Sequence, residues 1–154
     1  MIPSAYFKDK DGKSSLKATW YSEADMNIVA AVKSATEINR TFVDGAQPDE
    51  SVPANQPFSV VWEGEIYPPE SGQYLLGVET DRGVRMYVDG RQLIDEYYNE
   101  SPMKQDRPVV MEAGKPVKVR LVYRQTRQSG QIQLKWSQPS AATIAPQKLF
   151  ERVK

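Results

Sequence analysis

The stretch that decides the fold reads Trp62-Glu63-Gly64-Glu65-Ile66-Tyr67-Pro68-Pro69-Glu70-Ser71-Gly72-Gln73-Tyr74, then Thr80-Asp81-Arg82-Gly83-Val84-Arg85-Met86-Tyr87-Val88-Asp89-Gly90 and Leu93-Ile94-Asp95. Apolar and polar residues alternate along it, which is the period of a strand with one dry and one wet face. Prolines cannot donate to a β-ladder, so the Pro68-Pro69 run must turn. Asp89-Gly90 is a strong signal for a two-residue hairpin. The stretch predicts consecutive antiparallel strands.

The same alternation extends outward in both directions. Turn residues separate the apolar runs about every ten residues, as in an all-β sandwich or barrel. Strands are expected near residues 16–21, 58–66, 74–78, 84–88, 109–112, 117–124 and 131–136. Residues 1–15 are expected to form an irregular arm, and 44–57 a loop with three prolines. From Glu23 to Ile38 two alternatives stay open, a short helix or an irregular excursion.

The composition excludes several classes of protein. A chain of 154 residues makes one domain, and its 20 basic and 20 acidic residues cancel, so nothing favours nucleic acid as a partner. It has no histidine and no cysteine, which removes Ser-His-Asp and Cys-His catalysis and the usual zinc sites. No apolar run approaches the roughly 20 residues of a membrane span, so membrane insertion is not expected.

The order of these motifs resembles the PA14 family. The matching segments are Leu16 to Tyr21, Phe58 to Gly64, the Pro68-Pro69-x-x-Gly72-x-Tyr74 motif, Asp81 to Gly90, and Gly114 through Trp136. The resemblance implies an antiparallel two-sheet β-sandwich over residues 16–150 that is not itself an enzyme. Residues 1–15 and 151–154 look like junctions to a larger protein, similar to those of PA14 domains inserted in family 3 glycoside hydrolases, the β-glucosidases. Ile144, Leu149 and Phe150 are expected to pack back onto the sheets.

The resemblance also bears on calcium. In glycan-binding members of the family, two successive aspartates joined by a cis peptide bond hold a calcium ion that contacts sugar hydroxyls. Here Asp81 is followed by Arg82, so the second carboxylate is missing. A positive charge about 5 Å from a divalent cation would cost on the order of 6–7 kcal/mol. No cofactor is therefore expected, and Asp81 is predicted to be a turn residue. A further hypothesis is that Arg82 or Arg85 pairs with Asp81 and replaces the ion.

The candidate carbohydrate contacts lie in two loops, Asp95–Pro108 and Arg124–Gly130. Aromatic rings exposed in loops can stack on sugars, whereas buried ones would cover the end of the sandwich, and for Tyr97 and Tyr98 both alternatives stay open. The candidate binding residues are Tyr97, Tyr98 and Arg127, with Asp81 and Arg82 shaping the adjacent loop. No catalytic residue is predicted. Tryptophans 20, 62 and 136 are expected in the core, and the carboxylate pairs Glu63/Glu65 and Asp95/Glu96 on the solvated surface.

The function expected from these features is that of a non-catalytic accessory domain in a family 3 β-glucosidase. Its partners would be the catalytic domain of the parent enzyme and an oligo- or polysaccharide substrate, whose access the two loops would shape. The alternatives are an autonomous glycan-binding module of lectin or adhesin type and a structural spacer of a cell-surface protein. A periplasmic or secreted location is expected, with any export signal outside this sequence.

Overall fold

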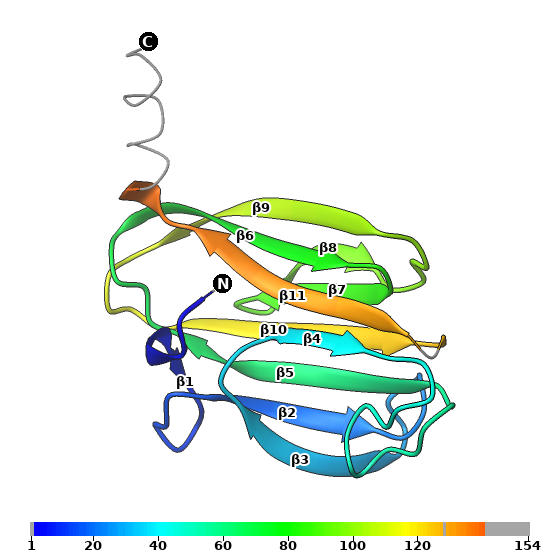
Figure 1. Cartoon of the computed structure of the whole chain (residues 1–154). Helices are drawn as coiled ribbons and strands as arrows, with labels where there is room; N and C mark the ends of the chain where they lie inside the picture. Colours follow the sequence, from blue (N-terminus) through cyan, green and yellow to red (C-terminus); the bar gives the residue numbers. More distant parts are fainter. Residues whose placement is uncertain (1, 128, 141–154) are drawn as a thin grey trace.

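The computed structural model describes residues 2–127 and 129–140. Two antiparallel sheets pack face to face, which confirms the predicted sandwich (Figure 1). One sheet has the order β3-β2-β5-β10-β7-β8, with β1 also paired to β5, and the other has the order β4-β11-β6-β9. A 3₁₀ turn, η1, comes first. The elements are η1 Ser4–Tyr6, β1 Phe7–Lys8, β2 Leu16–Tyr21, β3 Val29–Ala35, β4 Asn39–Phe42, β5 Phe58–Ile66, β6 Gly72–Thr80, β7 Gly83–Val88, β8 Arg91–Glu96, β9 Met103–Met111, β10 Val117–Gln125 and β11 Gly130–Ser137.

The core lies between the sheets and is filled by alternate residues of the strands. Trp62, Tyr74 and Tyr123 are its largest fully buried side chains. Trp20 is buried too, and Trp136 is partly buried against Tyr74, with 5.0 Å between the ring centroids. Burial of such large rings supplies much of the hydrophobic stabilisation, because the free energy gained scales with apolar area removed from water. The expected core role of the tryptophans is confirmed.

Both alternatives for residues 23–38, the short helix and the irregular excursion, are wrong for Val29–Ala35. Residues 29–35 form β3, which pairs with β2 from Leu16↔Ala35 to Tyr21↔Val29. The alanines favour helix only weakly, and six ladder partners along β2 outweigh that preference. Val29 and Val32 are β-branched, which suits an extended edge strand.

Two other expectations differ from the structure. Residues 1–15 are not wholly irregular, because Phe7 and Lys8 pair with Ile66 and Glu65 of β5. The connection expected from Asp95 to Pro108 spans only residues 97–102, since β9 begins at Met103. The predicted packing of residues 144, 149 and 150, and the junction at 151–154, lie outside the described residues. Over the described ranges no helix has the length and apolarity to cross a membrane.

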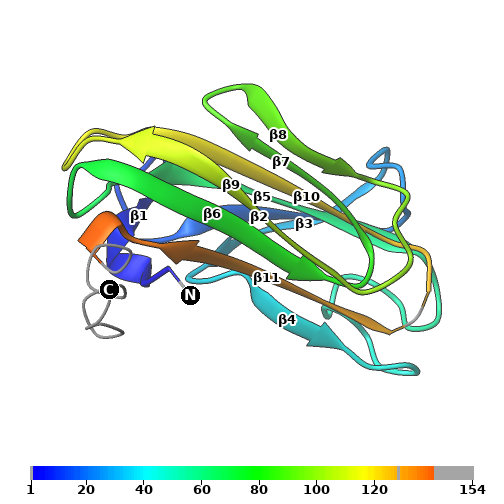
Figure 2. The same cartoon turned by 90° about the horizontal axis from the view of Figure 1, so that it is seen from above.

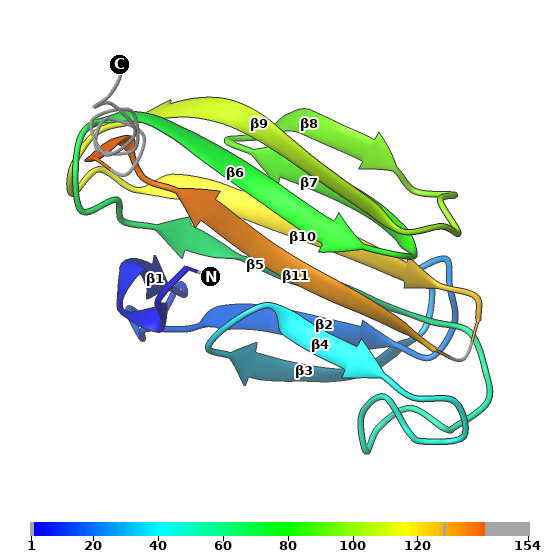
Figure 3. The ribbon, with the colours of Figure 1, turned by 45° about the horizontal axis from the view of Figure 1, so that its top comes forward.

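The topology brings several connections to one end of the sandwich. β6 and β10 run toward this end, and β7 and β11 start from it (Figure 3). The β2–β3 connection lies at the same end, opposite η1, as seen from above (Figure 2). Residues far apart in sequence therefore meet here, which makes this end the place to look for a site.

Candidate functional site

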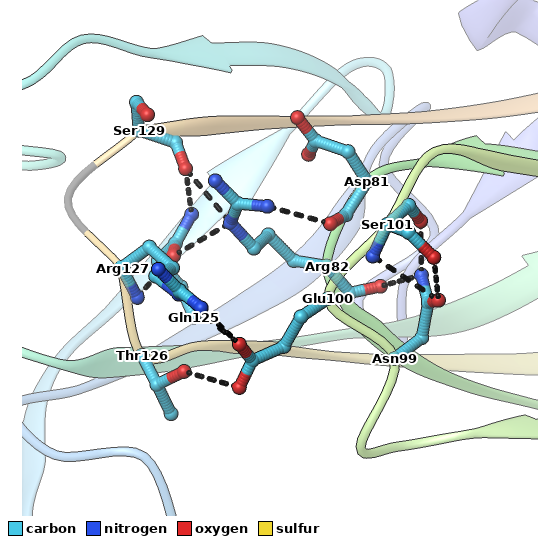
Figure 4. A network of polar contacts seen from close by, with 9 residues as sticks. All are labelled: Asp81, Arg82, Asn99, Glu100, Ser101, Gln125, Thr126, Arg127 and Ser129. Atoms are coloured by element: carbon cyan, nitrogen blue, oxygen red, sulfur yellow. Dashed lines mark hydrogen bonds and ion pairs between the residues drawn. The ribbon is translucent and has the colours of Figure 1, made fainter.

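Three connections form a polar network at this end, through residues 81–82, 97–102, and 126, 127 and 129 (Figure 4). Arg82 lies at its centre. Its Nε donates to the carbonyl oxygen of Ser129 at 2.9 Å and to Oε1 of Gln125 at 3.2 Å. Its Nη1 donates to the carbonyl oxygen of Asp81 at 2.8 Å. One guanidinium thus ties the β6–β7 turn to the β10–β11 turn.

Asp81 is a turn residue, as its position in the sequence predicts. Its Oδ1 accepts a hydrogen bond of 2.9 Å from the backbone N–H of Gln131. The peptide bond between Asp81 and Arg82 is trans, and the described part of the chain contains no group of three or more carboxylates that could hold a metal ion. The hypothesis that Arg82 or Arg85 forms an ion pair with the Asp81 carboxylate is wrong. Arg82 binds the carbonyl of Asp81 instead, and Arg85 pairs with Asp95 at 2.9 Å.

Gln125, which the sequence analysis missed, is the buried end of the network. It is fully buried, and its amide nitrogen donates to the hydroxyl of Tyr123 at 3.0 Å and to the carbonyl of Ser129 at 2.9 Å. Its Oε1 accepts from the backbone N–H of Arg127 at 2.7 Å. Burial raises the pKa of Tyr123 above its ordinary value, so the hydroxyl stays neutral. A glutamine at the last position of an alternating strand was the only signal in the sequence.

Arg127 connects the β10–β11 turn to the β8–β9 connection. Its Nη2 and Nε lie 2.7 and 3.1 Å from Oε1 of Glu100. The hydrogen bond from Arg127 lowers the pKa of Glu100 below its ordinary value. Asn99 also joins the loops, because its amide donates to the carbonyls of Arg82 and Ser101. The Arg127–Glu100 pair is exposed, so its net stabilisation is small, but it leaves charged donors and acceptors facing solvent.

The structure separates the two tyrosines. Tyr97 is 6% exposed, packs against Val61 and Val122, and donates its hydroxyl to the carbonyl of Ala24 at 3.1 Å. Tyr98 is 74% exposed. The two rings meet edge to face, 5.2 Å apart. Tyr97 therefore covers the end of the sheet, and the exposed ring belongs to Tyr98.

Arg124 supports this aromatic pair. Its guanidinium lies 5.3 Å from the ring of Tyr97 and 5.0 Å from that of Tyr98. Its Nε is buried without a hydrogen bond to the described residues and lies 3.8 Å from Oδ1 of Asp25. Arg85 lies 4.2 Å from the ring of Tyr97. Cation–π contacts of this kind are worth about 0.5–2 kcal/mol each. The contacts of Arg124 and Arg85 therefore help to hold Tyr97 and, through Arg124, the ring of Tyr98 in place.

Glu23 shapes the β2–β3 connection that carries Ala24 and Asp25. Its carboxylate accepts hydrogen bonds from the backbone N–H groups of Asp25, Asn27 and Ile28. Desolvation acts to raise the pKa of Glu23, but these three hydrogen bonds outweigh it and hold the pKa below its ordinary value of 4.5. The charged carboxylate therefore stabilises the folded loop.

Acidification is expected to loosen this loop. Since the folded pKa is depressed, the contribution of Glu23 is complete above pH 4.5 and disappears as the pH falls through the folded value. Urea unfolding between pH 7 and pH 3 should show the wild type losing its advantage over Glu23→Gln in that range. Glu37→Gln, at an exposed position, is the control. Parallel pH curves for wild type and Glu23→Gln would contradict this role.

Comparison with known proteins identifies the family. The PA14 domain model matches residues 12–149, so the chain belongs to the PA14 domain family, as its motifs indicate. The chain is 31% identical over 127 residues to the anti-sigma-I factor RsgI3 of Acetivibrio thermocellus, covering 82% of this chain and 19% of that protein. It therefore spans about a fifth of this curated relative.

Two solved structures show the same fold. An anti-sigma factor domain-containing protein from Clostridium clariflavum has a TM-score of 0.77 and 28% identity, over 82% of this chain and 43% of that one. A β-glucosidase of Kluyveromyces marxianus has a TM-score of 0.76 over 97% of this chain and 19% of that one, but 18% identity, which shows the fold alone. The β-glucosidase host predicted from the junctions is thus not supported by these relatives, which favour the autonomous-module alternative.

Proposed function

We propose that this domain is a non-catalytic carbohydrate-binding module. The observation that carries the proposal is the exposed ring of Tyr98, which meets Tyr97 edge to face and lies 5.0 Å from the guanidinium of Arg124. Its connection also carries Glu100, which pairs with Arg127. A flat aromatic face stacks on the C–H side of a sugar ring, and charged side chains next to it can bind the hydroxyls. Membership of a family with glycan-binding members supports the same conclusion.

The whole protein is proposed to be a regulator of anti-sigma type, in which this domain senses carbohydrate outside the cytoplasm. The relatives named as anti-sigma proteins support this host better than a glycoside hydrolase. The carbohydrate would then act as a signal, and the partner of the whole protein would be a sigma factor. Binding needs no metal in this proposal, because Arg82 occupies the position of the second aspartate and already connects the loops.

Titration calorimetry with glucose, galactose, mannose, xylose and their disaccharides tests the proposal. Tyr98→Ala is expected to weaken binding by about tenfold or more, the loss typical of an exposed aromatic anchor. Val110→Ala removes an exposed apolar side chain from β9 and serves as the control. The same titration with calcium and then with chelator should give equal affinities. Binding that Tyr98→Ala leaves unchanged would refute the assignment of this site.

A further inference from the structure

A groove crosses the outer face of the seven-stranded sheet, the face turned away from the core. It encloses about 870 Å³, the size of a site for several linked small rings. The β1–β2 connection, with Asp9 to Asp11, stands on one side of it, and Gly90 of the β7–β8 turn lies on another. It lies over the later part of β5 and the first part of β10, whereas Tyr98 follows β8 at the end where β10 finishes.

The floor of the groove is a row of side chains, one from each of five neighbouring strands. Cα partners run from Ser34 of β3 to Lys17 of β2, and from Lys17 to Glu63 of β5. The row continues from Glu63 to Arg120 of β10 and then to Tyr87 of β7. Four steps between strands at about 4.8 Å make the row about 19 Å long. A ligand along it would cross the strands rather than follow one of them.

A second row runs beside the first. Lys8 of β1 pairs with Glu65 of β5, which pairs with Lys118 of β10. On β5 and β10, which contribute to both rows, the two rows are two residues apart, which is about 7 Å. Side chains two residues apart point to the same face, so both rows face the groove.

The two rows alternate hydrogen-bond donors with acceptors. Lys17 lies 3.7 Å from Glu63, and the Arg120 guanidinium lies 5.5 Å from the ring of Tyr87. Glu65 accepts from the hydroxyl of Tyr67. Six basic side chains line the groove with four acidic ones, and one of the six, Lys33, is already bound to Asp49 and Glu50. The groove therefore carries little net charge but many donors and acceptors.

This chemistry suits a neutral chain of hydroxyl groups. Each hydroxyl donates and accepts, so it can bind an ammonium group on one side and a carboxylate on the other. A strongly anionic chain would meet the carboxylates of Glu63 and Glu65 in the middle of both rows. We propose that the groove binds a neutral polysaccharide chain laid across the neighbouring strands β3, β2, β5, β10 and β7. The inference rests on the proposed function and adds a second contact region for long chains.

Affinity for polymers compared with that for short sugars tests the groove. The probes are galactomannan, xyloglucan and hydroxyethylcellulose, with carboxymethylcellulose as the anionic counterpart. The variant Glu65→Ala/Lys118→Ala removes one acceptor and one donor from the second row, and Tyr87→Ala/Arg120→Gln disrupts the first row. Each is expected to weaken binding to a neutral polymer by about tenfold and to leave short-sugar binding unchanged. Lys104→Ala is the control, because this lysine is exposed on β9 of the other sheet.

The outcomes separate the two proposals. Unchanged polymer affinity in both folded groove variants would overturn the groove, as would binding of carboxymethylcellulose alone. If short sugars bind through Tyr98 but no polymer binds more tightly, the groove is refuted and the proposed function stands. If Tyr98→Ala has no effect while the groove variants lose polymer binding, the Tyr98 site is refuted and the groove stands. Urea unfolding of both double variants is the folding control. A midpoint equal to that of the wild type shows that a variant is folded.

Discussion

Gly83→Ala is expected to destabilise this domain strongly, although it adds only one methyl group. A Cβ on Gly83 would lie against the backbone carbonyl oxygen of Tyr97, well inside the 3.0 Å that real Cβ atoms respect. The backbone is held in place on both sides of this contact. β7 pairs with β10 through Gly83↔Arg124, and it pairs with β8 through Val84↔Glu96, the residue just before Tyr97. Backbone must move, so we expect a loss of about 3 kcal/mol in the free energy of unfolding.

The same substitution should also disturb the candidate binding site, because the displaced backbone carries Tyr97 and Tyr98. Urea unfolding measures the stability, and calorimetry with the best-bound sugar measures the site. Gly77→Ala is the matched control, since its Cβ would meet the carboxylate end of the exposed Asp106 side chain, which can rotate away. If Gly83→Ala and Gly77→Ala lowered the free energy of unfolding equally, a clash with the Tyr97 carbonyl would not explain the effect at Gly83.

Arg82→Ala is expected to separate the loops that the arginine joins. It removes the hydrogen bonds to the carbonyls of Asp81 and Ser129 and to the Gln125 amide. Gln125 keeps its bonds to Tyr123 and Arg127, so the buried amide is not orphaned. Charged hydrogen bonds at a half-buried site suggest a loss of about 1–2 kcal/mol in the free energy of unfolding.

Hydrogen exchange at the backbone amide of Gln131, whose N–H is bonded to Asp81, is expected to speed up in Arg82→Ala. Arg82→Lys keeps the charge but cannot reproduce the geometry of a planar guanidinium, so it should rescue little. Arg91→Ala, at an exposed position in β8, is the control. If stability and exchange in Arg82→Ala matched the wild type, the connecting role of Arg82 would be wrong.

Most of the fold was predictable because its signals are local. The two-residue period around Trp62 and the hairpin at Asp89-Gly90 need only neighbours in sequence, and both are confirmed by β5, β7 and β8. Asp89 and Gly90 both have positive φ, 50° and 80°, as such a turn requires. β3 was missed because an alanine-rich segment is extended only when β2 offers ladder partners.

The site was less predictable. The sequence placed Asp81, Arg82, Tyr97, Tyr98 and Arg127 in loops, but it left open which tyrosine is exposed. That depends on the carbonyl of Ala24, which lies 73 residues earlier and receives the hydroxyl of Tyr97. The bonding of Arg82 likewise depends on Ser129, 47 residues later. No local period encodes contacts at such separations.

The sequence by itself determined the PA14 sandwich, the absence of histidine and cysteine chemistry, and the replacement of a second aspartate by Arg82. Only the tertiary structure decided that Arg82 joins two turns, that Tyr98 is the exposed ring, and that five strands align Ser34, Lys17, Glu63, Arg120 and Tyr87 in one row. The reason is physical. Alternation of apolar residues is written along the chain, whereas exposure and register depend on which strands become neighbours.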